Sequence, residues 1–340
     1  MISRSWRNIA IIGVLLVLAI AVPRLGLPAF YVSLLTQTWI YGILAMSLDL
    51  LVGFTGLVSF MQAAFFGIGA YVVAIGATRY HFVDFWLTLV VAVLVAGIAA
   101  AAFGALALRA EDAGFIIITL ALNEIVWGLA YQWVSMSGGD NGITGFLRVN
   151  VGPFHTTDNS GFYYLSLTAL IICLTLLVLM VRSPFGLVLV GARERPRRMA
   201  ALGYNVWLFR YLALVIAAMF AAVAGVLFAY YNEFVGPGSL SLDTTVQVLI
   251  MVILGGTGTL IGPLLGAGIL VFLSNALSDI TQRWVLILGA VYVVTVMYAP
   301  DGIVGLINRL AARARSRREL SLAASAAPAG AFNPRGGPER

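Results

Sequence analysis

Apolar residues in this chain come in long continuous blocks rather than in the stripes of amphipathic helices. The clearest blocks are Ile9–Val22, Trp86–Leu108 and Tyr163–Val181. In hydrocarbon, a backbone can satisfy its polar groups only as a helix or as a closed barrel, and a barrel would show short alternating segments. The pattern therefore predicts an all-α polytopic membrane protein.

The blocks and their polar separators predict ten transmembrane segments. We expect them at about 9–27, 30–52, 57–78, 85–108, 113–135, 161–181 and 208–232, with two more within 245–277 and a last one at 283–299. As one helix, 245–277 would be about 50 Å long, against a hydrocarbon core of about 30 Å. The glycine-rich stretch Gly255–Pro263 therefore divides it into two crossing segments.

Charge fixes the expected orientation. The chain is 61% hydrophobic and 10% charged with a net charge of +6, and all 20 basic residues are arginine. Most of them lie at Arg4 and Arg7, at Arg182–Arg210 and at Arg309–Arg318, which flank apolar blocks. This is the positive-inside bias of membrane proteins rather than a nucleic-acid footprint.

Ten crossings place both termini and the loop 182–207 in the cytoplasm, whereas nine would leave the C-terminal arginines outside. We expect a transmembrane domain over 1–308, an external loop over about 136–160 and a disordered basic cytoplasmic tail over 309–340. The expected location is the cell (inner) membrane, in multi-pass form.

Residue types exclude most enzyme chemistry. Without lysine the chain lacks a Walker A loop, so any ATP hydrolysis has to occur on partner subunits, where ATP and Mg²⁺ would bind. His81, His155 and the single Cys173 suggest no nucleophile–base pair and no metal-ligand spacing. We therefore expect no catalytic residues, no metal site and no cofactor in this chain.

Two glycine-rich stretches echo each other. "GFTGLVSFMQAAFFGIG" (53–69) and "GGTGTLIGPLLGAG" (255–268) share G-x-T-G followed by G-x-G. Both are expected at cytoplasmic turns, which fits an internal repeat of the kind found in transporters. The alternative is that Gly and Thr are simply common where membrane helices pack. The predicted helix breaks are at Gly53, Gly56, Gly255, Gly256 and Gly258.

Several stretches together resemble the LivM-type permease subunits of ABC importers for branched-chain amino acids. They are "SLDLLVGFTGLVSFMQAAFFGIGAY" (47–71), "FIIITLALNEIV" (115–126), "GGDNGITG" (138–145), "SPFGLVLVGARERPRRMAALGYNV" (183–206), "LIMVILGGTGTLIGPLLGAGIL" (249–270) and "APDGIVGL" (299–306). The resemblance implies an ABC importer permease fold, a paralogous permease partner, two cytoplasmic ATPases and an external solute-binding protein. It implies hydrophobic amino acids as cargo.

Two alternatives stay open. One is an ABC permease for urea, amides or another small polar solute. The other is an ion-coupled secondary transporter with Asp49 and Glu124 as coupling carboxylates. A secondary transporter has no ATPase to contact, so the cytoplasmic Arg/Ala-rich loop favours the ABC permease.

The stretch "GARERPRRMAALG" (191–203) is the predicted ATPase-coupling segment. Pro196 suits a first helical turn and Gly203 a C-terminal cap, while Ala200 and Ala201 would let a helix lie close to a partner. The resemblance implies that this stretch contacts the ATPase, with Ala200, Ala201 and Gly203 on the family's Ala-Ala-x-Gly core. The predicted coupling residues are Glu194, Pro196, Arg197, Arg198, Ala200, Ala201 and Gly203. Where relatives often carry basic residues, this chain has Leu187 and Val190.

Polar residues inside apolar blocks are the candidates for a substrate pathway. They are Asp49, Gln62, Asn123, Glu124, Gln247 and Asn275. An ionisable group at membrane depth is costly and is a functional hypothesis by default. Glu124 lies near the middle of its span, whereas Asp49 lies near an inner end and is expected to reach water. The alternative for all six is hydrogen bonding between helices.

Overall fold

The computed structural model describes residues 28–280, apart from 81–83, 111, 152–155 and 157, and a few isolated positions outside that range. The predicted spans 9–27 and 283–299 and the tail 309–340 fall outside 28–280, and His81 and His155 fall in the gaps. The count of ten spans and the side on which the termini lie therefore stay predictions.

The described part is almost entirely helical. Its helices are α2 (Ala29–Asp49), α3 (Gln62–Arg79), α4 (Phe85–Ala107), α5 (Ala113–Gln132), α6 (Val134–Ser137), α7 (Asn159–Arg182), α8 (Pro184–Glu194), α9 (Pro196–Ala201), α10 (Val206–Asn232), α11 (Leu242–Gly255) and α12 (Ile261–Ile280). A π-helix, η2 (Leu50–Thr55), continues α2, and two 3-10 turns are η3 (Gly139–Asn141) and η4 (Pro237–Leu240). Two short antiparallel strands, β1 (Ile143–Thr144) and β2 (Phe234–Val235), pair Ile143 with Val235.

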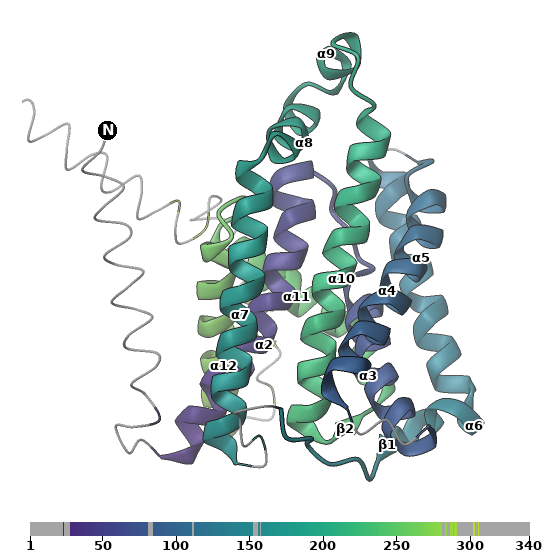
Figure 1. The fold of residues 1–340 in the computed structure, drawn as a ribbon. Helices are drawn as coiled ribbons and strands as arrows, with labels where there is room; N and C mark the ends of the chain where they lie inside the picture. Colours follow the sequence, from purple (N-terminus) through teal and green to yellow (C-terminus); the bar gives the residue numbers. More distant parts are fainter. Residues whose placement is uncertain are drawn as a thin grey trace, which may run out of the picture.

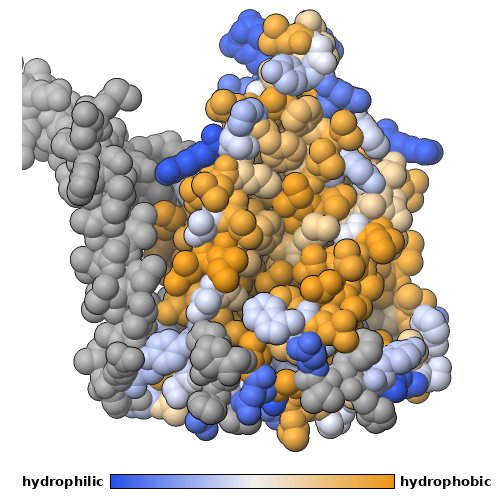
Figure 2. Space-filling model, viewed as in Figure 1, coloured by the Kyte–Doolittle hydropathy of each residue, from blue (hydrophilic) through white to orange (hydrophobic). Residues whose placement is uncertain are grey.

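Among the residues that the structure describes, six helical segments are long and apolar enough to cross a bilayer, which confirms the polytopic membrane class. They are Ala29–Thr55, α4, α5, α7, α10 and Ile261–Ser278. On the face drawn in Figure 2, apolar residues form a band, with hydrophilic residues above and below it. Helix α11, with 14 residues, is only about 21 Å long and does not span the core alone.

Helices α2 and α10 form the centre of the bundle. The most apolar window of the α2–η2 segment is 83% buried and that of α10 is 61% buried, against 22% for α5 and 28% for α4. Helix α10 packs on α3, α4 and α2, while α7 and α12 pack on α2 (Figure 1). Small residues allow this approach, because a side chain at Gly225 would overlap the Phe66 carbonyl and one at Gly69 the Ala222 backbone.

The two polar loops lie at opposite ends of the bundle. Helices α8 and α9 project from one end, and α6 with the β1–β2 pair closes the other (Figure 1). This agrees with the alternation of spans expected from the sequence. We refer to the α8–α9 end as the cytoplasmic end and to the β1–β2 end as the external end, following the predicted orientation.

One predicted span has a different beginning. The apolar block 57–78 was expected to be helical throughout, but α3 begins only at Gln62 and residues 57–61 are not helical. The reason is that Gly56, in the left-handed region with φ 76°, turns the chain back into the bundle. The chain then runs beside other helices as an irregular segment before α3 starts.

Candidate functional site

Helix α9 is a short helix with defined ends. Pro196 occupies its first turn, as expected, and none of its residues is buried. Gly203, with φ 89°, follows the helix; its N–H donates to the Ala200 carbonyl (3.0 Å) and that of Tyr204 donates to the Met199 carbonyl (3.2 Å). This pair of bonds is a Schellman cap, which requires a left-handed residue such as glycine.

Helix α8 connects α9 to the bundle. Its residues Val188, Leu189 and Ala192 are buried, whereas Leu187 is 71% exposed. The Arg210 Nη2 atom on α10 donates to the Ala192 carbonyl at 3.2 Å. Helix α8 is therefore attached on its inner side and presents apolar Leu187 outward.

Clefts flank α9 on both sides. One, of about 790 Å³, is lined by Pro196, Arg197 and Ala200 of α9, by Trp207 and Arg210 of α10, and by residues around the α4–α5 turn. The other, of about 390 Å³, is lined by Gly191, Glu194, Arg195, Arg198 and Met199. Five of the predicted coupling residues thus line hollows that a partner could fill, and Ala201 and Gly203 are exposed.

Three of the predicted pathway residues are buried and bonded to other elements. Asp49 was expected to reach water, but it is fully buried, because the backbone around Gly258 packs against this segment. Its two carboxylate oxygens accept the Gly258 N–H (2.6 Å) and the Leu260 N–H (3.1 Å). The Gln62 Nε2 atom donates to the Ser47 hydroxyl (2.7 Å) and to the Ala217 carbonyl (3.1 Å). The Asn123 Nδ2 atom donates to the Leu240 carbonyl at 3.0 Å. Each of these bonds holds two segments together.

The other three predicted pathway residues are more accessible. Glu124 is exposed on the outer face of α5, although its neighbour Asn123 is buried. Gln247 is half-buried on α11. Asn275, also half-buried, donates to the Val271 carbonyl of its own helix at 2.9 Å. The structure therefore does not gather the six residues into one cluster.

Three of the five predicted glycine breaks are turns in the structure, whereas Gly53 lies inside η2 and Gly255 ends α11, and the two breaks touch. Gly56, Gly256 and Gly258 have φ values of 76°, 108° and 78°, which only glycine adopts readily. A side chain at Gly53 would overlap the Gly258 backbone, and one at Gly255 would overlap the Gly262 carbonyl. Close approach, not only turning, explains these glycines.

The irregular segment 57–61 is a feature that the sequence did not reveal. The Phe60 N–H donates to the Thr119 hydroxyl on α5 (3.2 Å), and the Thr245 hydroxyl on α11 donates to the Phe60 carbonyl (3.2 Å). Non-helical backbone at membrane depth needs such partners, because lipid supplies none. The threonines could be identified only after the break itself was known.

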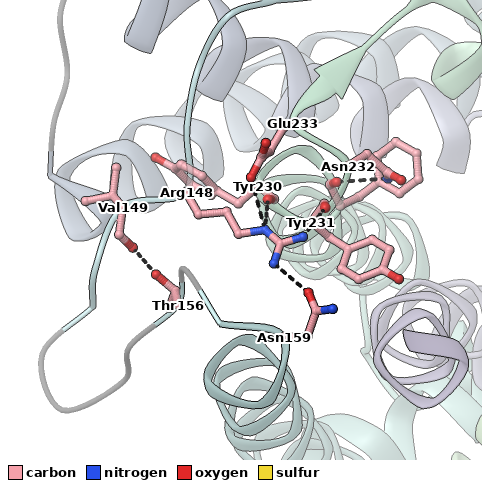
Figure 3. Close-up of polar contacts among 9 residues, drawn as sticks. Arg148, Val149, Thr156, Asn159, Tyr230, Tyr231, Asn232 and Glu233 are labelled. Carbon is pink, nitrogen blue, oxygen red and sulfur yellow. Dashed lines mark hydrogen bonds and ion pairs between the residues drawn. The ribbon is translucent and has the colours of Figure 1, made fainter. Parts of the chain in front are cut away.

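Arg148 at the external end was also missed. Its guanidinium donates to the carbonyls of Tyr230 (3.2 Å) and Tyr231 (2.9 Å), which end α10, and to Asn159 Oδ1 (3.1 Å), and it pairs with Glu233 (3.3 Å) (Figure 3). Its position in a glycine-rich loop was the only signal in the sequence. The contacts fasten the external loop to the ends of α7 and α10.

At the cytoplasmic end, Arg193 was interpreted only as part of a charge cluster. Its Nη1 atom donates to the Gly53 carbonyl in η2.

Within the part of the chain that the structure describes, no group of three or more His, Cys, Asp or Glu residues could hold a metal ion.

Comparison with known proteins identifies the family. The sequence model described as "Branched-chain amino acid transport system / permease component" matches residues 30–297. The chain is 31% identical to the high-affinity branched-chain amino acid transport system permease protein LivM of Salmonella typhimurium (85% of this chain, 73% of the relative) and to that of Escherichia coli K12 (85% and 73%). A probable branched-chain amino acid transport permease protein LivM of Methanocaldococcus jannaschii is 28% identical over 44% of each chain.

No solved structure matches the chain. Apart from Ala29, the match over residues 30–297 includes every membrane-capable helix in the described part of the chain, as well as α8, α9 and both glycine breaks. The chain is a multi-pass protein of the cell (inner) membrane and a transport component of a complex with other subunits, and it belongs to the branched-chain amino acid transport permease family.

Proposed function

We propose that this chain is the transmembrane permease subunit of an ABC importer for branched-chain amino acids. In this proposal it forms the translocation pathway with a paralogous permease subunit. Two cytoplasmic ATPases bind and hydrolyse ATP, and an external solute-binding protein delivers the substrate. The family and the printed function of the relatives support the cargo.

The position and exposure of α9 are the observations that support a role in coupling to an ATPase. It extends beyond the apolar band, has no buried residue and ends in a Schellman cap (Figures 1 and 2). A six-residue helix that packs so little of its surface against its own chain gains little from folding alone. A groove on a cytoplasmic ATPase is the partner we propose for Glu194, Pro196, Arg197, Arg198, Ala200, Ala201 and Gly203.

Uptake assays test the transport function. Cells that lack this chain should lose uptake of radiolabelled leucine, isoleucine and valine that a plasmid copy restores. Competition by excess urea or amide, but not by these amino acids, would favour the alternative polar cargo. Uptake that persists after ATP depletion and collapses with a protonophore would instead indicate an ion-coupled secondary transporter.

Ala201→Glu tests the coupling role of α9. Ala201 is exposed, so the subunit should still fold and insert, but a carboxylate should prevent close docking. We expect substrate-stimulated ATP hydrolysis by the reconstituted importer to fall by about tenfold or more, within the usual range of coupling between sites. Ala201→Ser, which keeps the small size, is the matched control. Normal stimulation in Ala201→Glu would reject the role. Gly203→Pro is less informative, because proline cannot adopt φ 89°.

The exposed face of α5 is our candidate for contact with the pathway. Glu124 is the twelfth of the 20 residues of α5, and a charge at that depth facing lipid would cost about 2.5–3.5 kcal/mol or more. Ala121 and Gly128 lie one turn away on either side, and a side chain at Gly128 would meet nothing within 4 Å. We therefore propose that this face meets the paralogous permease or a water-filled path.

Glu124→Gln tests this assignment, because it removes the charge and keeps the shape. Transport should slow, with a change in KM or in preference among leucine, isoleucine and valine. Glu124→Asp should retain more of the wild-type kinetics. Unchanged rate and selectivity in Glu124→Gln would remove the residue from the pathway.

A further inference from the structure

The two glycine breaks are joined by a buried carboxylate. Asp49 ends α2, and its oxygens accept the N–H groups of Gly258 and Leu260, directly before α12 begins at Ile261. The first N–H groups of a helix have no partner within it and favour negative charge. Asp49 therefore holds the start of α12 against the end of α2.

Gly53 makes this contact close. A side chain there would overlap both the Gly258 backbone and the Asp49 carboxylate. The residue lies in η2, a π-helix, and such irregular turns often occur at functional sites. The geometry gives one compact junction, made of Asp49, Gly53 and Gly258.

Arg193 reaches this junction from α8. Its Nη1 atom donates to the Gly53 carbonyl, and its stem covers Gly56, where an added side chain would lie 2.9 Å from the Arg193 Cγ atom. The last carbonyls of a helix favour a cation, so Arg193 caps the end of η2 as Asp49 caps the start of α12. The charge of Arg193 also attracts the Asp49 carboxylate.

Helices α8 and α9 are directly connected and lie in close contact. Only Arg195 separates them, and a side chain at Gly191 would lie 2.8 Å from the Met199 sulfur of α9. A displacement of α9 therefore shifts α8 and, with it, the guanidinium of Arg193. This guanidinium contacts the junction through the Gly53 carbonyl.

We infer that Arg193 is a positioning residue that links α9 to both glycine breaks. When a partner pulls on α9, Arg193 changes the packing of Gly53 against Gly258, and thereby moves α2 relative to the α11–α12 hairpin. This inference rests on the proposed docking of α9 to an ATPase. It adds the route by which that docking reaches the helices.

The test uses the complete importer in proteoliposomes with its partner permease, ATPases and binding protein. Arg193→Met keeps a stem over Gly56 but removes the donor and the charge. We expect it to assemble with the ATPases and to lose about tenfold of the substrate-stimulated hydrolysis and uptake. Arg193→Lys, which restores a cationic donor with a shorter reach, should recover part of that loss.

Arg109→Ala is the matched control, because Arg109 is an exposed cytoplasmic arginine in the α4–α5 turn. It should behave as wild type. A second readout is non-additivity: once Arg193→Met is present, Asp49→Asn should reduce coupling by much less than it does alone, because both act through one junction.

Three results would overturn the inference. They are normal coupling in Arg193→Met, full additivity with Asp49→Asn, and a lowered unfolding temperature with unchanged coupling per assembled transporter. Normal coupling in Arg193→Met together with uncoupled Ala201→Glu would reject only the role of Arg193. Normal coupling in Ala201→Glu would instead reject the docking of α9.

Discussion

Arg148 and Arg193 each place a guanidinium at the carboxyl end of a membrane helix, at opposite ends of the molecule. Arg148, with a side chain only 14% exposed, contacts the last carbonyls of α10, Asn159 and Glu233, and stacks over Phe162 and Tyr231. Arg193 is exposed overall and reaches its carbonyl from a short helix outside the bundle. One arginine is fixed by many partners, whereas the other depends on where α8 lies.

The difference shows how one chemical device serves two purposes. A cation at a helix C-terminus stabilises the end of that helix in either case. Arg148 and the carbonyls that it contacts belong to a packed network, so the external loop is held firmly to the end of α10. Where the arginine belongs to an exposed element, the strength of the contact depends on the position of that element.

The largest expected effect comes from a substitution at the cytoplasmic end, in the contact between Gly53 and Gly258. Gly53→Ala puts a methyl group into the Gly258 backbone, which cannot move without separating the two breaks. We expect a loss of about 3 kcal/mol or more, at the upper end of overpacking costs. The yield of monodisperse protein and the apparent unfolding temperature in detergent measure it.

Gly128→Ala is the control for this change, because its added methyl group meets nothing within 4 Å. It should be neutral or slightly stabilising, since alanine favours a helix. If the two variants unfold at the same temperature, the close contact between the breaks is not a source of stability.

The second largest effect is expected at the external end, where Arg148→Ala removes the guanidinium that fastens the loop. Arg148→Ala leaves the end carbonyls of α10 and the Glu233 carboxylate without their partner. Hydrogen bonds to a charged group suggest a local loss of about 2 kcal/mol. Backbone hydrogen exchange should rise by about 30-fold in residues 143–151 and 230–235. It should stay unchanged around residues 50–56 and 256–260.

Glu233→Gln gives the smallest effect. The Glu233 side chain is 42% exposed, so its ion pair is screened by water and is worth less than about 1 kcal/mol. Exchange in the same segments should rise by less than about fivefold. A loss as large as that of Arg148→Ala would mean that the ion pair, rather than the carbonyl contacts, fastens the loop.

Helix positions followed from the sequence because the hydrophobic effect acts locally. Each of the eight predicted spans within 28–280 contains a helix, and the split of 245–277 at Gly255–Pro263 is confirmed by α11 and α12. Pro196 and Gly203 predicted the ends of α9 because both residues have fixed backbone preferences. These signals require no knowledge of the rest of the chain.

The parts that escaped prediction depend on contacts between distant residues. Asp49 and Gly258 are 209 positions apart, so the burial of Asp49 could not be inferred from its place near a span end. The segment 57–61 is mostly apolar, so its sequence resembles that of a membrane helix. It is irregular because Gly56 turns the chain before it and because threonines distant in the sequence bond to the Phe60 backbone. The contact of Arg193 with the Gly53 carbonyl could not be predicted, because nothing in the sequence distinguishes Arg193 from the arginines around it.

The threonine partners of Phe60 bear on how the protein is made. Thr245 is synthesised 185 residues after Phe60, which at about 5–20 residues per second is on the order of ten to forty seconds. During that interval the Phe60 carbonyl is without its native partner on α11, while α3 and α4 are already emerging from the ribosome. The first half of the molecule therefore reaches its final form only once the second half has entered the membrane.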